Sequence, residues 1–134
     1  MADAIYPNAK GHFLAGDIDV DTATLKIVLV DTASYTYSTA HDALDDIPAG
    51  MRLATSGAIT SKTTTSGTLD FADVTVTGLD TGETADAYVL YVDSGVEATS
   101  YLIAYKDSAA ELPLAGATGV DVVVQVNASG FFTL

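Results

Sequence analysis

The chain has 134 residues, and its 18 acidic residues against 5 lysines and arginines give a formal net charge of −13. Five basic residues are too few to neutralise a run of phosphates. We therefore expect neither a nucleic acid nor an anionic membrane surface as a partner. Cysteine is absent, so disulfides, zinc–thiolate sites and thiol nucleophiles are excluded as well.

The length favours one domain, and a hydrophobic content of 49% is enough for a core without a disulfide or metal staple. No apolar run reaches the length that spans a bilayer. Residues 1–7 have neither a basic region nor an apolar region of the secretory kind, so we expect no signal peptide.

The first element is an arm or a short helix over residues 4–15. Pro7 suits the first position of a helix, whereas Gly11 weakens a helix interior. Because this segment precedes the strand-rich part, we expect it to reach a neighbouring protein. Its candidate partner-contact residues are Ile5, Tyr6, Phe13 and Leu14.

Residues 24–32 predict the first strand, and its apolar side chains on both faces indicate an interior position in a sheet. Residues 34–39 alternate tyrosine with small polar residues, as in an edge strand or an extended loop. Residues 41–47 predict a helical turn, because Leu44 and Ile47 lie three apart on one face.

The second half of the chain predicts more strands. Residues 68–79 alternate through Val74 and Val76. Two apolar segments, residues 86–93 and 100–106, are separated by a short loop and predict a hairpin.

The C-terminal part predicts a loop at residues 112–119 and a strand at residues 120–127. On that strand we expect one face to carry Val120, Val122, Val124 and Val126. After a turn, residues 131–134 form an apolar tail. We expect this tail to pair into a sheet, because exposed neighbouring phenylalanines promote aggregation.

About seven or eight short strands separated by turns predict a mainly β fold. The expected fold is an antiparallel β-sandwich, jelly-roll or immunoglobulin-like, or a small barrel, with at most one or two short helices. Long helical periodicity is missing, which argues against alternating β and α units. We expect an N-terminal arm or short helix at residues 1–16 and a single β-sandwich domain at residues 17–134.

Three alternating carboxylates, Asp17, Asp19 and Asp21, have the chemistry of calcium ligands. An EF-hand loop starting at Asp17 would need glycine where Thr22 stands and glutamate where Val28 stands. The three side chains are better explained as the solvent face of an extended segment.

A second acidic group, Asp42, Asp45 and Asp46, follows His41. Histidine beside carboxylates can bind a metal or transfer protons, but aspartates at a helix start also complement the helix dipole. The other histidine, His12, is distant in sequence, so we favour the structural interpretation. Without a nucleophile elbow or a phosphate-binding loop, we expect no catalytic residue, no metal site and no cofactor.

Seven tyrosines raise the possibility of sugar binding through aromatic faces. Those of the apolar hairpin are expected in the core or on a sheet face: Tyr88, Tyr91, Tyr101 and Tyr105. The tyrosines left as candidates for exposure are Tyr6, Tyr35 and Tyr37. Tryptophan, the strongest stacking residue, is absent.

Three stretches resemble a family of small tailed-phage virion proteins. They are LKIVLVDTASYTYSTAHDALDDIP at residues 25–48, YVLYVDSGVEATSYLIAY at 88–105 and VVVQVNASGFFTL at 122–134. Each stretch is weak alone, but their order is fairly specific as a set, and they are distributed along the chain from residue 25 to residue 134.

The resemblance implies a β-rich, non-enzymatic virion component, most simply a head decoration or cement protein. Its implied partner is the major capsid protein, with self-association into a homo-oligomer as a further possibility. The implied location is the outer surface of the head, after synthesis in the host cytoplasm. Two alternatives stay open: a tail or fibre component with an adaptor or receptor-binding role, and a carbohydrate-binding module.

Overall fold

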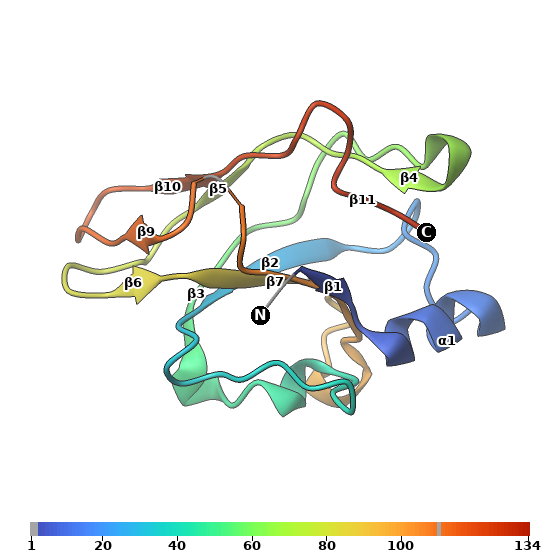
Figure 1. The fold of residues 1–134 in the computed structure, drawn as a ribbon, viewed down its shortest axis with the longest axis horizontal. Helices are drawn as coiled ribbons and strands as arrows, with labels where there is room; N and C mark the ends of the chain where they lie inside the picture. The colour runs from blue at the N-terminus through green and yellow to red at the C-terminus, as the bar shows by residue number, and fades with distance from the viewer. Residues whose placement is uncertain (1–2, 110) are drawn as a thin grey trace.

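The computed structural model describes residues 3–109 and 111–134, and its largest element is a five-stranded antiparallel sheet (Figure 1). The strands lie in the order β1-β8-β7-β2-β3. Their bounds are Ala4–Ile5 for β1, Leu25–Val30 for β2, Arg52–Thr55 for β3, Ala87–Val92 for β7 and Leu102–Lys106 for β8.

Three two-stranded antiparallel sheets complete the β-structure. They pair β4 (Thr68–Leu69) with β11 (Phe132–Thr133), β5 (Val74–Val76) with β10 (Val122–Val124), and β6 (Thr84–Ala85) with β9 (Leu114–Ala115). In Figure 1 the strands β4, β5, β10 and β11 lie above β2 and β7.

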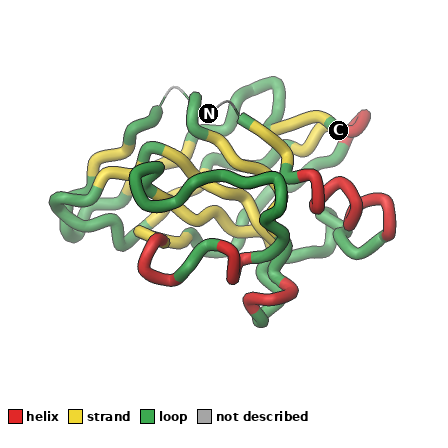
Figure 2. Tube along the Cα trace, turned by 60° about the horizontal axis from the view of Figure 1, so that its bottom comes forward, coloured by secondary structure: helices red, strands yellow, loops and turns green. Residues whose placement is uncertain are grey.

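The described residues contain one α-helix, α1 (Pro7–Ala15), and four 3-10 turns. These turns are η1 (Leu44–Asp46), η2 (Ala49–Met51), η3 (Thr65–Gly67) and η4 (Glu97–Thr99). Figure 2 shows the helical segments at the margin of the strands. The predicted mainly β, antiparallel fold is confirmed, and within the described chain the sheets do not close into a barrel.

One face of the large sheet packs toward the small sheets. Leu29 lies opposite Tyr88, and Ile27 lies opposite Leu90. Residues directly across an antiparallel pair point to the same face. The ring of Tyr88 is 6.2 Å from that of Phe131, which directly precedes β11. The odd-numbered side chains of β2 therefore fill the space between the two layers.

The other face of the sheet is covered by the loop that follows β2. Val28 lies opposite Val89, and Val89 lies opposite Tyr105, so all three share this face. The ring of Tyr105 is 5.3 Å from Tyr37 and 6.4 Å from Tyr35, both in that loop. Because both faces of β2 and β7 are covered, their side chains are apolar on both sides, as an interior strand requires.

Several predicted elements are confirmed. β2 lies between β7 and β3, and β7 forms the predicted hairpin with β8. Leu44 and Ile47 are both buried at turn η1. The C-terminal tail pairs through β11 with β4, and Phe131 is buried.

Other predictions need correction. Of the two alternatives for residues 34–39, the structure has the loop and not the strand, and residues 112–119, predicted as a loop, contain β9. The strand predicted at 120–127 is only β10. Val120 lies in a turn, in which its amide donates to the carbonyl of Ala117. It therefore does not pair with β5, and it is 58% exposed.

The N-terminal segment is part of the domain rather than a separate arm. Ile5 pairs with Ala104 of β8, and the amide of Tyr6 donates to the carbonyl of Ile103. Tyr6 and Ala9 are fully buried in the common core. The packing of the core therefore continues across the expected domain boundary at residue 16. Met1 and Ala2 lie outside the described residues.

Helix α1 begins at Pro7, as predicted, and continues through Gly11. A proline at the first helical position loses no helical hydrogen bond. The helix ends at Gly16, which has a φ of 82°. The amides of Gly16 and Asp17 donate to the carbonyls of Phe13 and His12, which closes the last turn.

Candidate functional site

An apolar groove of about 310 Å³ lies between helix α1 and the C-terminal tail. Its lining residues are Ile5, Lys10, Phe13, Leu14, Thr133 and Leu134. Leu14 is 91% exposed and Leu134 is 62% exposed. Two exposed leucines beside a hollow mark this groove as the candidate interaction site.

Three elements build the groove. On α1, Lys10, Phe13 and Leu14 share one face because residues three and four apart are neighbours on a helix. β1 contributes Ile5. The tail is held beside them by β11 and by the amide of Leu134, which donates to the carbonyl of Gly67, the last residue of η3.

Three of the four predicted contact residues, Ile5, Phe13 and Leu14, line this groove. Tyr6 does not, because its side chain is fully buried. The prediction of Tyr6 as a surface contact is therefore wrong for this fold. Sequence reasoning also missed Leu134. The apolar character of the tail was the available signal in the sequence. It did not indicate that the tail lies beside α1, because only the fold defines its position.

Buried tyrosines form a network beneath α1. The hydroxyl of Tyr6 is 2.8 Å from that of Tyr35, and the Tyr35 hydroxyl is 2.8 Å from Nδ1 of His41. Burial raises the pKa of Tyr6, and burial also raises the pKa of Tyr35 to about 12. Both side chains therefore stay neutral and structural. Of the three tyrosines that were candidates for exposure, Tyr6 and Tyr35 are buried, and only Tyr37 is partly accessible.

Helix α1 also carries a charged cluster around His12. Its Nε2 is 2.7 Å from Oδ1 of Asp42, and its Nδ1 is 3.0 Å from Oδ2 of Asp17. The imidazole stacks on Tyr101 with ring centroids 3.7 Å apart. Sequence reasoning set His12 aside as distant from Asp42, but the fold brings the two together.

His41 does not join the carboxylates that follow it in sequence. Its Nδ1 faces Tyr35, as described above. Asp46 instead accepts the amides of Asp42 and Ala43 at 2.6 and 3.3 Å, at the start of η1. This aspartate therefore caps the turn, in agreement with the structural interpretation.

The alternating aspartates have separate partners. Asp17 binds His12, Asp19 accepts the amide of Asp21 at 3.1 Å, and Asp21 accepts the hydroxyl of Thr64 at 3.2 Å. Across residues 3–109 and 111–134, no three His, Cys, Asp or Glu side chains are grouped to hold a metal ion. Nor does that part of the chain contain a helix long and apolar enough to cross a membrane.

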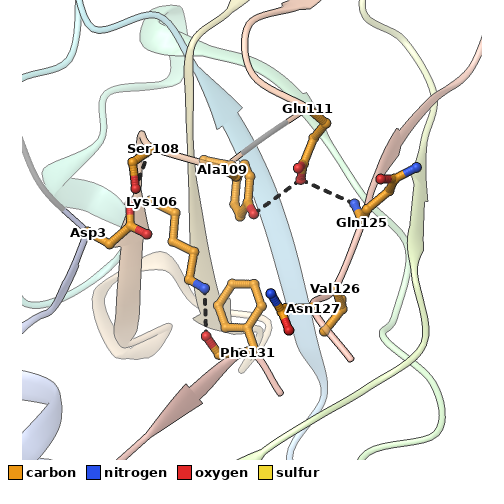
Figure 3. Close-up of a pocket in the computed structure, with 10 residues that line it drawn as sticks. Asp3, Lys106, Ser108, Ala109, Glu111, Gln125, Val126, Asn127 and Phe131 are labelled. Atoms are coloured by element: carbon orange, nitrogen blue, oxygen red, sulfur yellow. Dashed lines mark hydrogen bonds between the residues drawn. The ribbon is translucent and has the colours of Figure 1, made fainter. Parts of the chain in front are cut away.

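A second, more polar cavity of about 370 Å³ lies between β8 and the segment before β11 (Figure 3). The amine of Lys106 donates to the carbonyl of Phe131 at 2.6 Å and lies 4.1 Å from the centre of its ring. Glu111 accepts the hydroxyl of Tyr88 at 3.4 Å and the amide of Gln125 at 3.2 Å.

The charged side chains of this polar cavity interact with other groups of the same chain. Burial lowers the pKa of Lys106, while the nearby carboxylates of Asp3 and Glu111 oppose that shift. Asp3 accepts the amides of residues 107 and 108 at 3.0 and 3.1 Å. The cavity therefore works as a junction that ties the C-terminal segment to the sheet.

Comparisons with known proteins add no relative from which a site could be transferred. No protein-family model matches the chain, and no curated protein matches it. The candidate site rests on its own geometry: an apolar groove on α1, held to the body by a charged cluster and a buried tyrosine network.

Proposed function

We propose that this protein is a non-enzymatic structural component of a phage virion. It acts as a decoration protein that binds the major capsid protein on the outside of the assembled head. The apolar groove of α1 and the C-terminal tail carries this proposal, and the sequence resemblance to small tailed-phage virion proteins supports it.

The groove has the properties of a docking surface. Leu14 and Leu134 expose most of their side chains in the isolated protein. Burying a leucine stabilises a contact by about 1.5–3 kcal/mol. A modest contact of this kind is sufficient for a component that is present in many copies, because the copies together strengthen the shell.

Charge defines the complementary surface on the partner. The protein has a net charge of −13, and four of its basic residues are engaged within the chain. The four, with their partners, are Lys26 with Asp93, Arg52 with Glu97, Lys62 with the carbonyl of Ala23, and Lys106 with that of Phe131. The outer surface is thus dominated by carboxylates, which favours a basic capsid surface around an apolar contact.

Two groups with the right chemistry for catalysis, His12 and Lys106, are occupied by partners within the chain. His12 has a carboxylate on each ring nitrogen, and the amine of Lys106 is bound to a backbone carbonyl. Sugar binding is disfavoured, because the rings of Tyr6 and Tyr35 are buried and are not available to stack on a sugar. These observations favour a binding role over an enzymatic one.

The test uses capsids assembled without this protein, to which purified protein is added back. The variant Leu14→Ser/Leu134→Ser removes the exposed apolar groups of the groove. Its matched control, Val96→Ser/Val120→Ser, changes two other exposed apolar side chains that do not line the groove. Occupancy per particle and the temperature of particle disruption are measured.

We expect the unaltered protein and the control to bind saturably, at hundreds of copies per head, and to raise the disruption temperature. The groove variant should lose about tenfold or more in affinity, because two leucines no longer become buried. Equal binding of the groove variant would rule out the groove as the docking surface. Binding to tails alone would make the protein a tail component.

A further inference from the structure

His12 lies in the last turn of α1, next to two residues that line the groove. Its side chain is 20% exposed, and those of Asp17 and Asp42 are 50% and 46% exposed. Asp17 follows the helix, whereas Asp42 belongs to the loop before η1. The imidazole therefore connects the end of α1 to a different part of the domain.

The geometry defines the protonation state of this ring. A carboxylate only accepts hydrogen bonds, and a neutral imidazole has a single N–H to donate. With carboxylate oxygens at 3.0 Å from Nδ1 and 2.7 Å from Nε2, only the doubly protonated ring donates to both. A neutral ring would turn a lone pair toward one of the carboxylates.

Two further features of the site favour the cation. His12 lies near the C-terminal end of α1, where the helix dipole stabilises positive charge. The ring stacks on Tyr101 at an interplanar angle of 20°, and aromatic faces attract cations. The ring of His12 thus faces the carboxylates of Asp17 and Asp42 and the aromatic ring of Tyr101.

We propose that a proton on His12 locks the last turn of α1 onto the body of the protein, and that losing this proton loosens the groove. The lock is a property of the fold alone. Its consequence for capsid docking rests on the function proposed above.

The two ends of α1 are held in different ways. The first turn is fixed by contacts that do not titrate near neutral pH: Ala9 is fully buried, and the amide of the Asn8 side chain donates to the carbonyls of Ala40 and His41. The last turn carries Phe13 and Leu14, which line the open groove. There the bridge from His12 to Asp42 is the polar tie to the body.

The direction of the pH effect follows from the raised pKa of His12. Burial lowers this pKa, but the hydrogen bonds that the ring donates to the carboxylates of Asp17 and Asp42, and the negative charges of these groups, outweigh burial. The stabilisation is complete below the ordinary imidazole pKa of about 6.5. It is lost as the pH rises through the higher value of the folded protein. The groove is thus expected to be ordered at mildly acidic pH and to loosen as the pH rises through the raised pKa of His12.

The experiment measures amide hydrogen-exchange protection factors by NMR between pH 6 and pH 9. The unaltered protein is compared with His12→Gln, whose amide NH2 can still donate to a carboxylate but cannot become charged. Amides of β2 report on global opening, and those of residues 12–15 report on the last turn of α1.

In the unaltered protein, protection of residues 12–15 should fall about threefold as the pH rises, as expected for a half-exposed ion pair. Protection of β2 should stay constant, and the midpoint should match the titration of the His12 ring. In His12→Gln the last turn should be loose at every pH. A last turn that does not respond to pH, or a midpoint that survives in His12→Gln, would overturn the lock.

The same two proteins are then added to capsids at pH 6 and pH 9. We expect the unaltered protein to bind capsids more weakly at pH 9 than at pH 6. His12→Gln should bind equally at both pH values. If the last turn titrates by NMR but neither protein binds capsids, the proposed function fails and the lock stands. If the last turn titrates and capsid binding is the same at both pH values, the lock does not control docking.

Discussion

The hydroxyl of Tyr6 lies 2.8 Å from the hydroxyl of Tyr35, and both rings are buried. Tyr6 stands between β1 and α1, whereas Tyr35 lies in the loop after β2. Tyr35 also contacts His41 at 2.8 Å. This pair joins the N-terminal segment to the loop that covers one face of the sheet, and so it positions the helix that carries the groove.

Removing either hydroxyl should lower the free energy of unfolding. Tyr6→Phe and Tyr35→Phe should each cost about 1 kcal/mol, the usual net value of a buried hydrogen bond. The double variant should cost less than the sum, because the two hydroxyls share one bond. Urea denaturation of the four proteins measures the cycle. Strict additivity would mean that this bond contributes nothing.

The side chain of Val124 is fully buried in β10, whereas that of its neighbour Val123 is 41% exposed. Val124→Asp should therefore destabilise the domain by about 3 kcal/mol or more, because an unpaired carboxylate enters the core. Val123→Asp is the matched control and should melt close to the parent protein. The comparison is made by thermal unfolding followed by circular dichroism. Similar melting of both variants would contradict the facing of β10.

Deleting residues 1–14 should destabilise the whole domain, rather than remove a free arm. The deletion removes β1 from the sheet and takes Tyr6 and Ala9 out of the core. We expect the melting temperature to fall by about 10 °C or more. A truncated protein that melts like the parent would show that residues 4–15 do not belong to the core in solution.

Lys26 and Asp93 form an ion pair at 2.7 Å. The hydrogen bond from Lys26, helped by the amide of Gly95, holds the pKa of the Asp93 carboxyl below its usual value. Because the folded value is depressed, this stabilisation is present above the ordinary carboxyl pKa of about 3.9 and is lost as the pH falls through the folded value.

The variant Asp93→Asn tests this pair. At pH 6 it should be less stable than the parent by at most about 1 kcal/mol, because the pair is partly exposed. Urea denaturation at several pH values measures the difference, which should shrink toward zero in strong acid. A difference that stays constant down to pH 2 would mean that ionisation of Asp93 does not contribute.

The local pattern of the sequence was enough to predict most of the large sheet. The apolar run in 24–32, and the two apolar segments around residue 96, predicted β2 and the β7–β8 hairpin. These predictions succeeded because side-chain alternation and short connections are local properties of a strand. The tail at residues 131–134 was also predicted to pair, because its phenylalanines need cover.

The tertiary structure alone decided which polar and aromatic residues meet. Tyr6 and Tyr35 have ordinary sequence neighbours and were candidates for exposure, yet the fold buries both against each other. His12 meets Asp42 from 30 residues away. The physical reason is that composition and periodicity indicate which side chains of a segment can be buried. The path of the chain in the folded protein decides which distant segment packs against those side chains.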